Sequence, residues 1–289
     1  MRDGRTGLIS GNVAGFRGSC YSVGMDRSES DATANSTGRV FFGDRIVKGT
    51  EKTSLVQAVF DGVADRYDLM NDLMSAGVHR RWKQVMVEML NPTASIQLAD
   101  VAGGTGDIAF RVWNWLTRRG RSPSPSCRVT VCDITESMVA RARDRALNRG
   151  ITRGVDFIVA DAEILPLASA SQDAVTNAFG IRNVTDPLAA LHETRRVLRR
   201  GGRFLCLEFG GPVGPGLDRL YDTYTSQVLP RLGQLVTTQG ASYRYLAESI
   251  RRFPDRDVFA GQIEEAGLDR VRVHVLSGGI VTLYSAWRL

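Results

Sequence analysis

The sequence contains no run of apolar residues close to the roughly 20 that a helix needs to cross a bilayer. Helical membrane spans are therefore excluded, and any membrane contact has to be peripheral. Histidine is rare, with 3 residues, and no two cysteines form a CxxC pair. Structural zinc sites need such ligands at short spacing, so we expect no metal. The cysteines, which we interpret as reduced thiols of a cytosol or an organelle matrix, are Cys20, Cys127, Cys132 and Cys206.

Positive charge is in excess, but it is not concentrated in a block. The formal net charge is +6 and the isoelectric point is about 9.4, a balance that favours anionic partners such as nucleic acid or anionic lipid. Arginine pairs begin at positions 80, 118, 195, 199 and 251, spread along the chain. We therefore interpret the charge as a solvated basic surface and expect no nucleic-acid partner.

The chain divides by composition into a tail and one domain. Residues 1–52 are rich in Gly, Ser, Thr, Asn and Arg without a sustained apolar period, so we predict a mobile or disordered tail. Residues 1–25 are faintly similar to an organelle transit peptide, and Met25 is an alternative start. Residues 53–289 form the predicted domain, whose length is sufficient to bury a sizeable core.

The domain begins with two helices and continues with strands and helices in alternation. A helical period predicts a cover helix from Thr53 that carries Val56, Val59, Phe60, Val63 and Tyr67 on one face. A second helix is expected at 81–90, ended by Asn91-Pro92. Predicted strands are 98–102, 128–133, 155–160, 174–179 and 203–209, and predicted helices are 108–118, 136–149 and 187–199. This alternation predicts an α/β fold with a doubly wound parallel sheet, which binds ligands at the carboxyl ends of its strands.

A glycine loop follows the first of these strands, in the stretch LADVAGGTGDIAF at 98–110. The dinucleotide fingerprint GxGxxG holds a pyrophosphate on a helix N-terminus. Here the order is GGTGD, with Ala109 three residues after Gly106 and Asp107 at the helix start. An acid there repels a pyrophosphate but suits a cation. The loop therefore favours S-adenosylmethionine, a sulfonium without phosphate, over a dinucleotide; a tight turn without a ligand is the alternative.

Acidic residues at the ends of the next two strands support the same cofactor. Asp133 ends the second strand, where a carboxylate can accept both ribose hydroxyls, and Asp161-Ala162 ends the third, where side chain and backbone can read adenine. An acid after a strand is alternatively a helix N-cap. The ordered series of glycine loop and two acids on three successive strands favours adenosylmethionine over that alternative.

Several longer strings closely resemble the ubiquinone/menaquinone biosynthesis C-methyltransferase family, over about residues 53–289. They are VFDGVADRYDLMNDLMSAGVHRRWK, DVAGGTGD, DITESM, ADAEILP, FGIRNVTD, GGRFLCLEF and SYRYLAESIRRFP. The resemblance implies a Rossmann-like seven-stranded methyltransferase sheet with a reversed last strand, matched by 271–275 and 280–288. It also implies methyl transfer from S-adenosylmethionine to a ring carbon of a polyprenylated benzoquinol (2-polyprenyl-6-methoxy-1,4-benzoquinol) or of demethylmenaquinol.

The predicted cofactor residues combine the glycine loop with the positions that match the family. They are Asp100, Gly104, Thr105, Gly106, Asp133, Asp161 and Ala162. The predicted catalytic residues come from the chemistry. A ring carbon is a poor nucleophile until the adjacent phenol, with a pKa near 10, loses its proton. Arg182 and Asn183 follow the fourth strand, where Arg182 would hold the phenolate and Asn183 would orient it. An ion pair of Arg182 with Asp186 is the alternative, and Tyr67 and His79 are further candidates.

A substrate with an isoprenoid tail gives three more expectations. Residues 217–235 carry an apolar helical stripe interrupted by Pro230, which predicts a kinked helical lid. Its apolar face is either core or a grip for the tail. We expect a cytoplasmic protein, peripheral at the inner membrane and a candidate member of a quinone-biosynthesis complex, with the mitochondrial matrix as the alternative location. Rival functions are a methyltransferase for another small acceptor and a non-catalytic scaffold.

Overall fold

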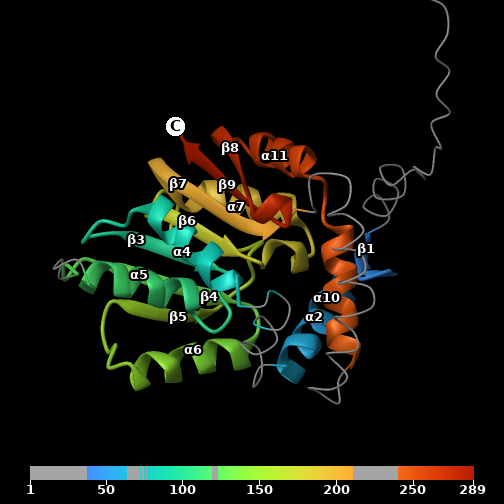
Figure 1. Ribbon diagram of the computed structural model, residues 1–289, viewed down its shortest axis with the longest axis horizontal. Helices are drawn as coiled ribbons and strands as arrows, with labels where there is room; N and C mark the ends of the chain where they lie inside the picture. The colour runs from blue at the N-terminus through green and yellow to red at the C-terminus, as the bar shows by residue number, and fades with distance from the viewer. Residues whose placement is uncertain (1–37, 64–71, 73–74, 76, 119–122, 211–239) are drawn as a thin grey trace, which may run out of the picture.

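The computed structural model describes residues 38–63, 72, 75, 77–118, 123–210 and 240–289 (Figure 1). In this part of the chain, seven strands form one sheet in the order β5-β4-β3-β6-β7-β9-β8. The strands are β3 (Gln97–Val101), β4 (Arg128–Asp133), β5 (Val155–Val159), β6 (Gln172–Ala178), β7 (Leu198–Phe209), β8 (Asp269–Leu276) and β9 (Val281–Arg288).

The sheet is parallel except at β9, which runs antiparallel to both β7 and β8. The predicted doubly wound α/β sheet with a reversed last strand is therefore confirmed. Strands β3 and β6 are buried along most of their length, as expected where helices cover both faces of a sheet. The chain leaves β3 toward β4 on one side and later crosses to β6 on the other. This reversal of strand order leaves a crevice at the carboxyl ends of β3 and β6.

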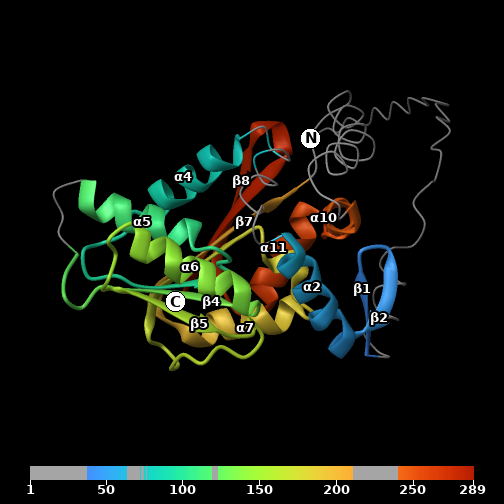
Figure 2. The same cartoon turned by 90° about the horizontal axis from the view of Figure 1, so that it is seen from below.

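Helices cover the sheet on both faces. One core cluster joins the sheet to α4 (His79–Leu90), α5 (Asp107–Arg118) and α6 (Glu136–Asn148). The other joins it to α7 (Pro187–Val197) and α11 (Arg256–Glu265). Figure 2 shows α4 and α7 on opposite sides of the sheet. Within the described residues, the positions predicted from periodicity to be strands and helices are occupied by elements of the predicted type.

The N-terminal part of the domain begins earlier than the sequence predicts. A hairpin of β1 (Arg39–Phe42) and β2 (Arg45–Lys48) leads directly into α2 (Gly49–Val63). Residues 39–52 are therefore regular structure and not part of a disordered tail, which corrects the boundary at 52. The hairpin has its own turn at Gly43, whose φ of +58° suits glycine.

Helices α2 and α10 (Gly240–Arg252) contact each other and lie beside the carboxyl ends of the strands (Figures 1 and 2). The expected N-terminal helical cover is thus present as α2. Helices α10 and α11 were not predicted from periodicity. The expected lid at 217–235 and the candidate Tyr67 lie outside the described residues. No helix of the described part is both long and apolar enough for a membrane span.

Candidate active site

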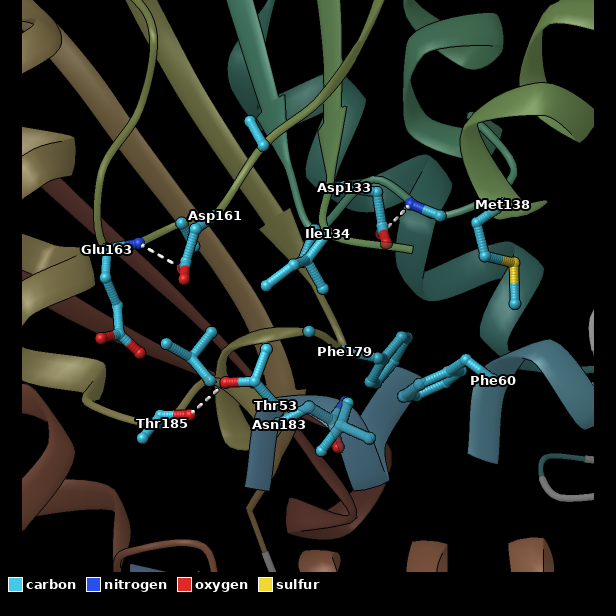
Figure 3. Close-up of a pocket in the computed structure, with 17 residues that line it drawn as sticks. Thr53, Phe60, Asp133, Ile134, Met138, Asp161, Glu163, Phe179, Asn183 and Thr185 are labelled. Atoms are coloured by element: carbon cyan, nitrogen blue, oxygen red, sulfur yellow. Dashed lines mark hydrogen bonds between the residues drawn. The ribbon is translucent and has the colours of Figure 1, made fainter. Parts of the chain in front are cut away.

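A cleft opens between the carboxyl edge of the sheet and α2 (Figure 3). Its space is about 700 Å³, including the part open to solvent, within the size range of sites for small molecules and cofactors. Its walls come from α2 and from the loops that follow β3, β4, β5 and β6. The cleft therefore lies at the edge of the sheet where the strand order predicted a ligand site.

The glycine loop after β3 forms one wall of the cleft, and Gly103 and Gly104 lack a side chain for different reasons. A Cβ on Gly103 would stand 2.9 Å from Val131 Cγ1 and from the Asp100 carbonyl, so the turn can pack on the sheet only without one. Gly104 has a φ of +55°, and nothing lies within 4 Å of where its Cβ would be. Gly104 lines the cleft, so its missing side chain leaves room for a ligand to approach the backbone.

Asp133 lies at the end of β4, directly beside this loop. Its Oδ2 accepts a hydrogen bond from the Gly104 amide at 2.8 Å (Figure 3). Its Oδ1 accepts one from the Thr135 amide at 2.9 Å. Burial raises the pKa of this carboxyl, and the two amide hydrogen bonds oppose that rise. Each carboxylate oxygen keeps a second lone pair, with which it can accept a ribose hydroxyl.

Asp161 and Ala162 line the cleft at the end of β5. Asp161 Oδ1 accepts from the Glu163 amide at 2.9 Å, which fixes the loop. Ile134 and Met138 contribute apolar side chains to the lining from the β4 side (Figure 3). The cleft therefore has an apolar surface for a flat base next to backbone and carboxylate groups that can read its edge.

Three predicted cofactor residues lie outside the lining. The hydroxyl and carbonyl oxygens of Thr105 accept from Arg145 Nη1 on α6. Asp100 is buried below the glycine turn, where Oδ1 accepts from the Thr176 hydroxyl at 2.8 Å and burial raises its pKa to about 7. A Cβ on Gly106, whose φ is +80°, would stand 3.0 Å from the ring of Phe110. These residues hold the loop from behind.

The predicted catalytic pair separates in the structure. Asn183 lines the cleft, whereas the buried side chain of Arg182, 4% exposed, lies behind the lining. Arg182 Nη1 donates to both carboxylate oxygens of Glu208 at 3.0 Å and to the Phe179 carbonyl at 2.6 Å. The partner is therefore Glu208 at the end of β7 and not Asp186, whose carboxylate caps α7 by accepting from the amides of Leu188 and Ala189. We expected the Arg182 guanidinium to reach the cleft and hold the phenolate. The structure corrects this, because the guanidinium is paired with Glu208 behind the lining.

His79 starts α4 and lies apart from the cleft lining. Its Nδ1 is 2.8 Å from the Ser75 hydroxyl, and burial, with Lys83 nearby, lowers its pKa to about 4. The imidazole is thus neutral at neutral pH. Lys83 forms an ion pair of 3.0 Å with Asp107, so the acid that opens α5 is held by a cation of α4.

Helix α2 supplies site residues that sequence reasoning missed. Thr53, Val56 and Phe60 line the cleft, whereas the predicted site residues included none of them. The helix is attached on both sides of the cleft, by Gln57 Nε2 to the Ile134 carbonyl at 2.9 Å and by Lys52 Nζ to the Val184 carbonyl at 2.7 Å. Composition alone carried no signal for these contacts across the cleft.

The charge of the lining tests which cofactor fits. Asp133, Asp161 and Glu163 are acidic, and none of the other described residues that line the cleft is basic. A pyrophosphate would meet these carboxylates without a compensating cation, whereas a sulfonium and an amino group are favoured by them. The open backbone at Gly104 and the acceptor at Asp133 complete a site that fits adenosylmethionine.

The fold and the site define a class I methyltransferase. Solved structures share the fold: a SAM-dependent methyltransferase from Thermotoga maritima superposes with a TM-score of 0.53 at 17% identity, over 81% of this chain and 100% of that one. The methyltransferase in a complex with the Haloferax volcanii Trm112 methyltransferase activator gives a TM-score of 0.55 at 16% identity, over 79% of this chain and 97% of that one.

The chain belongs to the ubiE/COQ5 methyltransferase family, whose model matches residues 47–288. Ubiquinone/menaquinone biosynthesis C-methyltransferases of Bradyrhizobium diazoefficiens and Paracoccus denitrificans are each 50% identical to it, over 251 and 248 residues, which are 86% of this chain and 96% of either relative. The predicted family, the methyltransferase activity and the adenosylmethionine cofactor are thus confirmed. The match begins within the hairpin, in agreement with the corrected domain start.

Proposed function

We propose that this enzyme methylates a ring carbon of a polyprenylated benzoquinol (2-polyprenyl-6-methoxy-1,4-benzoquinol), of demethylmenaquinol, or of both. The names of the relatives that match nearly their whole length support the quinol as acceptor. The observation that carries the proposal is the lining of the cleft, which combines acidic groups for a cationic methyl donor with an apolar end. At that end, Phe60 and Phe179 lie close to each other (Figure 3).

Asp133, Asp161, Ala162 and Gly104 are the residues proposed to bind the cofactor. The Asp133 carboxylate would accept the ribose hydroxyls, and the loop of Asp161 and Ala162 would read the adenine edge. Bound adenosylmethionine supplies an electrophilic methyl group. Asp100, Thr105 and Gly106 support the loop from behind and act as positioning residues.

The remaining chemistry concerns the acceptor oxygen. Removal of the phenol proton places negative charge on the oxygen next to the ring carbon, and fixed donors stabilise such a charge. Asn183 and Thr185 are the described polar side chains after β6 that line the cleft. The Thr185 hydroxyl is 3.2 Å from the Thr53 hydroxyl, with which it shares a hydrogen bond, so we assign the contact with this oxygen to Asn183. Arg182, paired with Glu208, is assigned a positioning role under the turn that carries Asn183. Tyr67 stays a candidate for proton removal.

Purified protein with adenosylmethionine and a short-chain analogue of each quinol tests the reaction, with mass spectrometry of the methylated ring. The expected result is transfer of one methyl group to at least one acceptor. Isothermal titration with adenosylmethionine separates an enzyme from a scaffold, because absence of binding at millimolar cofactor would exclude catalysis. The quinone profile of a deletion strain then distinguishes the two acceptors, and unchanged quinones would overturn the proposal.

We also propose that the protein is peripheral at the cytoplasmic face of the inner membrane, with the mitochondrial matrix as the alternative. The net charge of +6 and a lipid-soluble acceptor support contact with an anionic surface. Flotation with liposomes, with and without anionic lipid, tests this. Retention on anionic vesicles that is lost in high salt is expected, whereas no retention on either would show that the substrate reaches the enzyme in another way. Co-purification would test membership of a quinone-biosynthesis complex.

A further inference from the structure

We infer that Tyr245 is a positioning residue that orients the Asn183 amide so that its NH₂ group faces the acceptor oxygen. The Tyr245 hydroxyl on α10 donates to Asn183 Oδ1 at 3.1 Å, which uses the carbonyl end of the amide. The inference rests on the proposed function, because the NH₂ group has a role only if the acceptor carries an oxygen there. It adds a residue of a distant helix to the site.

The backbone at Asn183 is already fixed, so the side-chain amide is the group that has to be oriented. Residues Ile181–Asn183 form a 3₁₀ turn, η2, in which the backbone N–H of Asn183 donates to the Gly180 carbonyl at 3.0 Å. Asn177 holds the start of this turn: its Oδ1 accepts from the Ile181 amide at 2.9 Å, and its Nδ2 donates to the Val101 carbonyl at 2.9 Å. The remaining freedom of Asn183 lies in its side-chain torsions.

Packing and burial fix both the position of the Tyr245 ring and the protonation of its hydroxyl. Its side chain is buried, with the residue 4% exposed, and its ring is stacked on Phe42 of the N-terminal hairpin, with centroids 4.4 Å apart and planes 20° apart. Burial raises the pKa of the phenol, so the hydroxyl keeps its proton and remains a donor. In the flipped amide the NH₂ group would instead donate to the phenol oxygen, and the phenol hydrogen would lose Oδ1, the acceptor that it has in the structure, so the flip is disfavoured.

The orientation of the Asn183 side-chain amide decides whether a hydrogen-bond donor or an acceptor faces the cleft. With Oδ1 held by Tyr245, Nδ2 is the free end, and no described residue accepts a hydrogen bond from it. A donor at this position stabilises negative charge on an acceptor oxygen, whereas the carbonyl of a flipped amide would repel it. The hairpin and α10 thus contribute to the chemistry without lining the cleft.

A double-mutant cycle tests this relation. Tyr245→Phe keeps the ring on Phe42 and removes only the hydroxyl, and we expect kcat for quinol methylation to fall about tenfold with the Kd of adenosylmethionine unchanged. Asn183→Ala should lower kcat about 100-fold, and the double variant should be no slower than Asn183→Ala. The acidic limb of the kcat profile should move to higher pH in Tyr245→Phe, because an Asn183 side chain that is no longer held in place donates less well to the oxyanion.

Tyr284→Phe is the matched control. Tyr284 on β9 is also buried and lies outside the lining of the cleft, so the loss of its hydroxyl should leave kcat unchanged. A Tyr245→Phe enzyme as fast as wild type would overturn the inference, and so would a tenfold effect that persists in the Asn183→Ala background. If the wild type itself transfers no methyl group to either quinol, the proposed function fails instead.

Discussion

The amide of Gly104 donates to Oδ2 of Asp133 at 2.8 Å and joins the two walls of the cofactor cleft. The first wall is the turn after β3, and the second is the end of the neighbouring strand β4. Both residues line the cleft, at the point where a ribose is proposed to bind. The Asp133 carboxylate therefore has two roles, because it holds the glycine loop and is proposed to bind the ligand. Substitutions of Gly104 and of Asp133 can distinguish these roles.

Replacement of Gly104 by alanine tests the ligand side. The new Cβ would meet no atom within 4 Å, so it would stand in the space proposed for the cofactor. At a φ of +55° the strain should lower the free energy of unfolding by about 1 to 2 kcal/mol. The affinity for adenosylmethionine should fall at least tenfold in isothermal titration.

Gly201→Ala is the control for strain. Gly201 has a φ of +78° and also nothing within 4 Å of an added Cβ, but it belongs to β7 and not to the cleft. It should show a similar loss of stability with unchanged affinity. Equal affinity losses in the two variants would mean that strain, and not space at the cleft, explains the effect.

Replacement of Asp133 tests the loop and the ligand together. Asp133→Ala removes the charged acceptor of the Gly104 and Thr135 amides as well as of the ribose hydroxyls. Adenosylmethionine binding should weaken by about 1.5 to 3 kcal/mol, measured by isothermal titration. Asp133→Asn keeps one oxygen and should lose less. Unchanged affinity in Asp133→Ala would show that the residue serves only the loop.

The Arg182–Glu208 ion pair predicts that the effect of replacing Arg182 on stability depends on whether Glu208 is present. Glu208 is fully buried, so Arg182→Met would leave its charge without a partner, at a cost of about 3 to 5 kcal/mol in urea unfolding. Arg182→Met combined with Glu208→Leu should recover most of this stability. If Arg182 positions the turn of Asn183, kcat should stay low in the stable double variant. Normal kcat there would limit Arg182 to a role in stability.

The elements of the fold were predictable because each leaves a local pattern. Alternating apolar strands and periodic helices identified the doubly wound sheet, and strand ends located Asp133 and Asp161. The hairpin was missed inside a polar stretch, although Gly43-Asp44 between apolar residues is a turn signal that could have found it.

Partners across the sheet leave no such pattern. Asp186, four residues from Arg182, is the partner that sequence spacing indicates for an ion pair. Because β6 and β7 are neighbours, however, Glu208 at the end of β7 lies next to the loop that carries Arg182. Tyr245 reaches Asn183 from 62 positions away. Sequence spacing cannot identify these contacts, because they depend on how α10 packs against the end of the sheet.

The buried histidine of α4 predicts a stability loss in acid. Burial lowers the pKa of His79 from 6.5 to about 4, so between these values the unfolded chain binds more protons than the folded one. His79 therefore stabilises the fold above pH 6.5, and this contribution is lost as pH falls toward 4. A shift of this size corresponds to on the order of 3 kcal/mol.

The exposed His192 on α7 provides the control. Urea unfolding from pH 4 to 7 should give a wild-type minus His79→Gln difference that decreases with acidity, while His192→Gln follows wild type. A His79→Gln difference that stays constant over this range would mean that the imidazole is protonated inside the fold, and it would restore His79 as a charged group beside Asp72, 3.8 Å away.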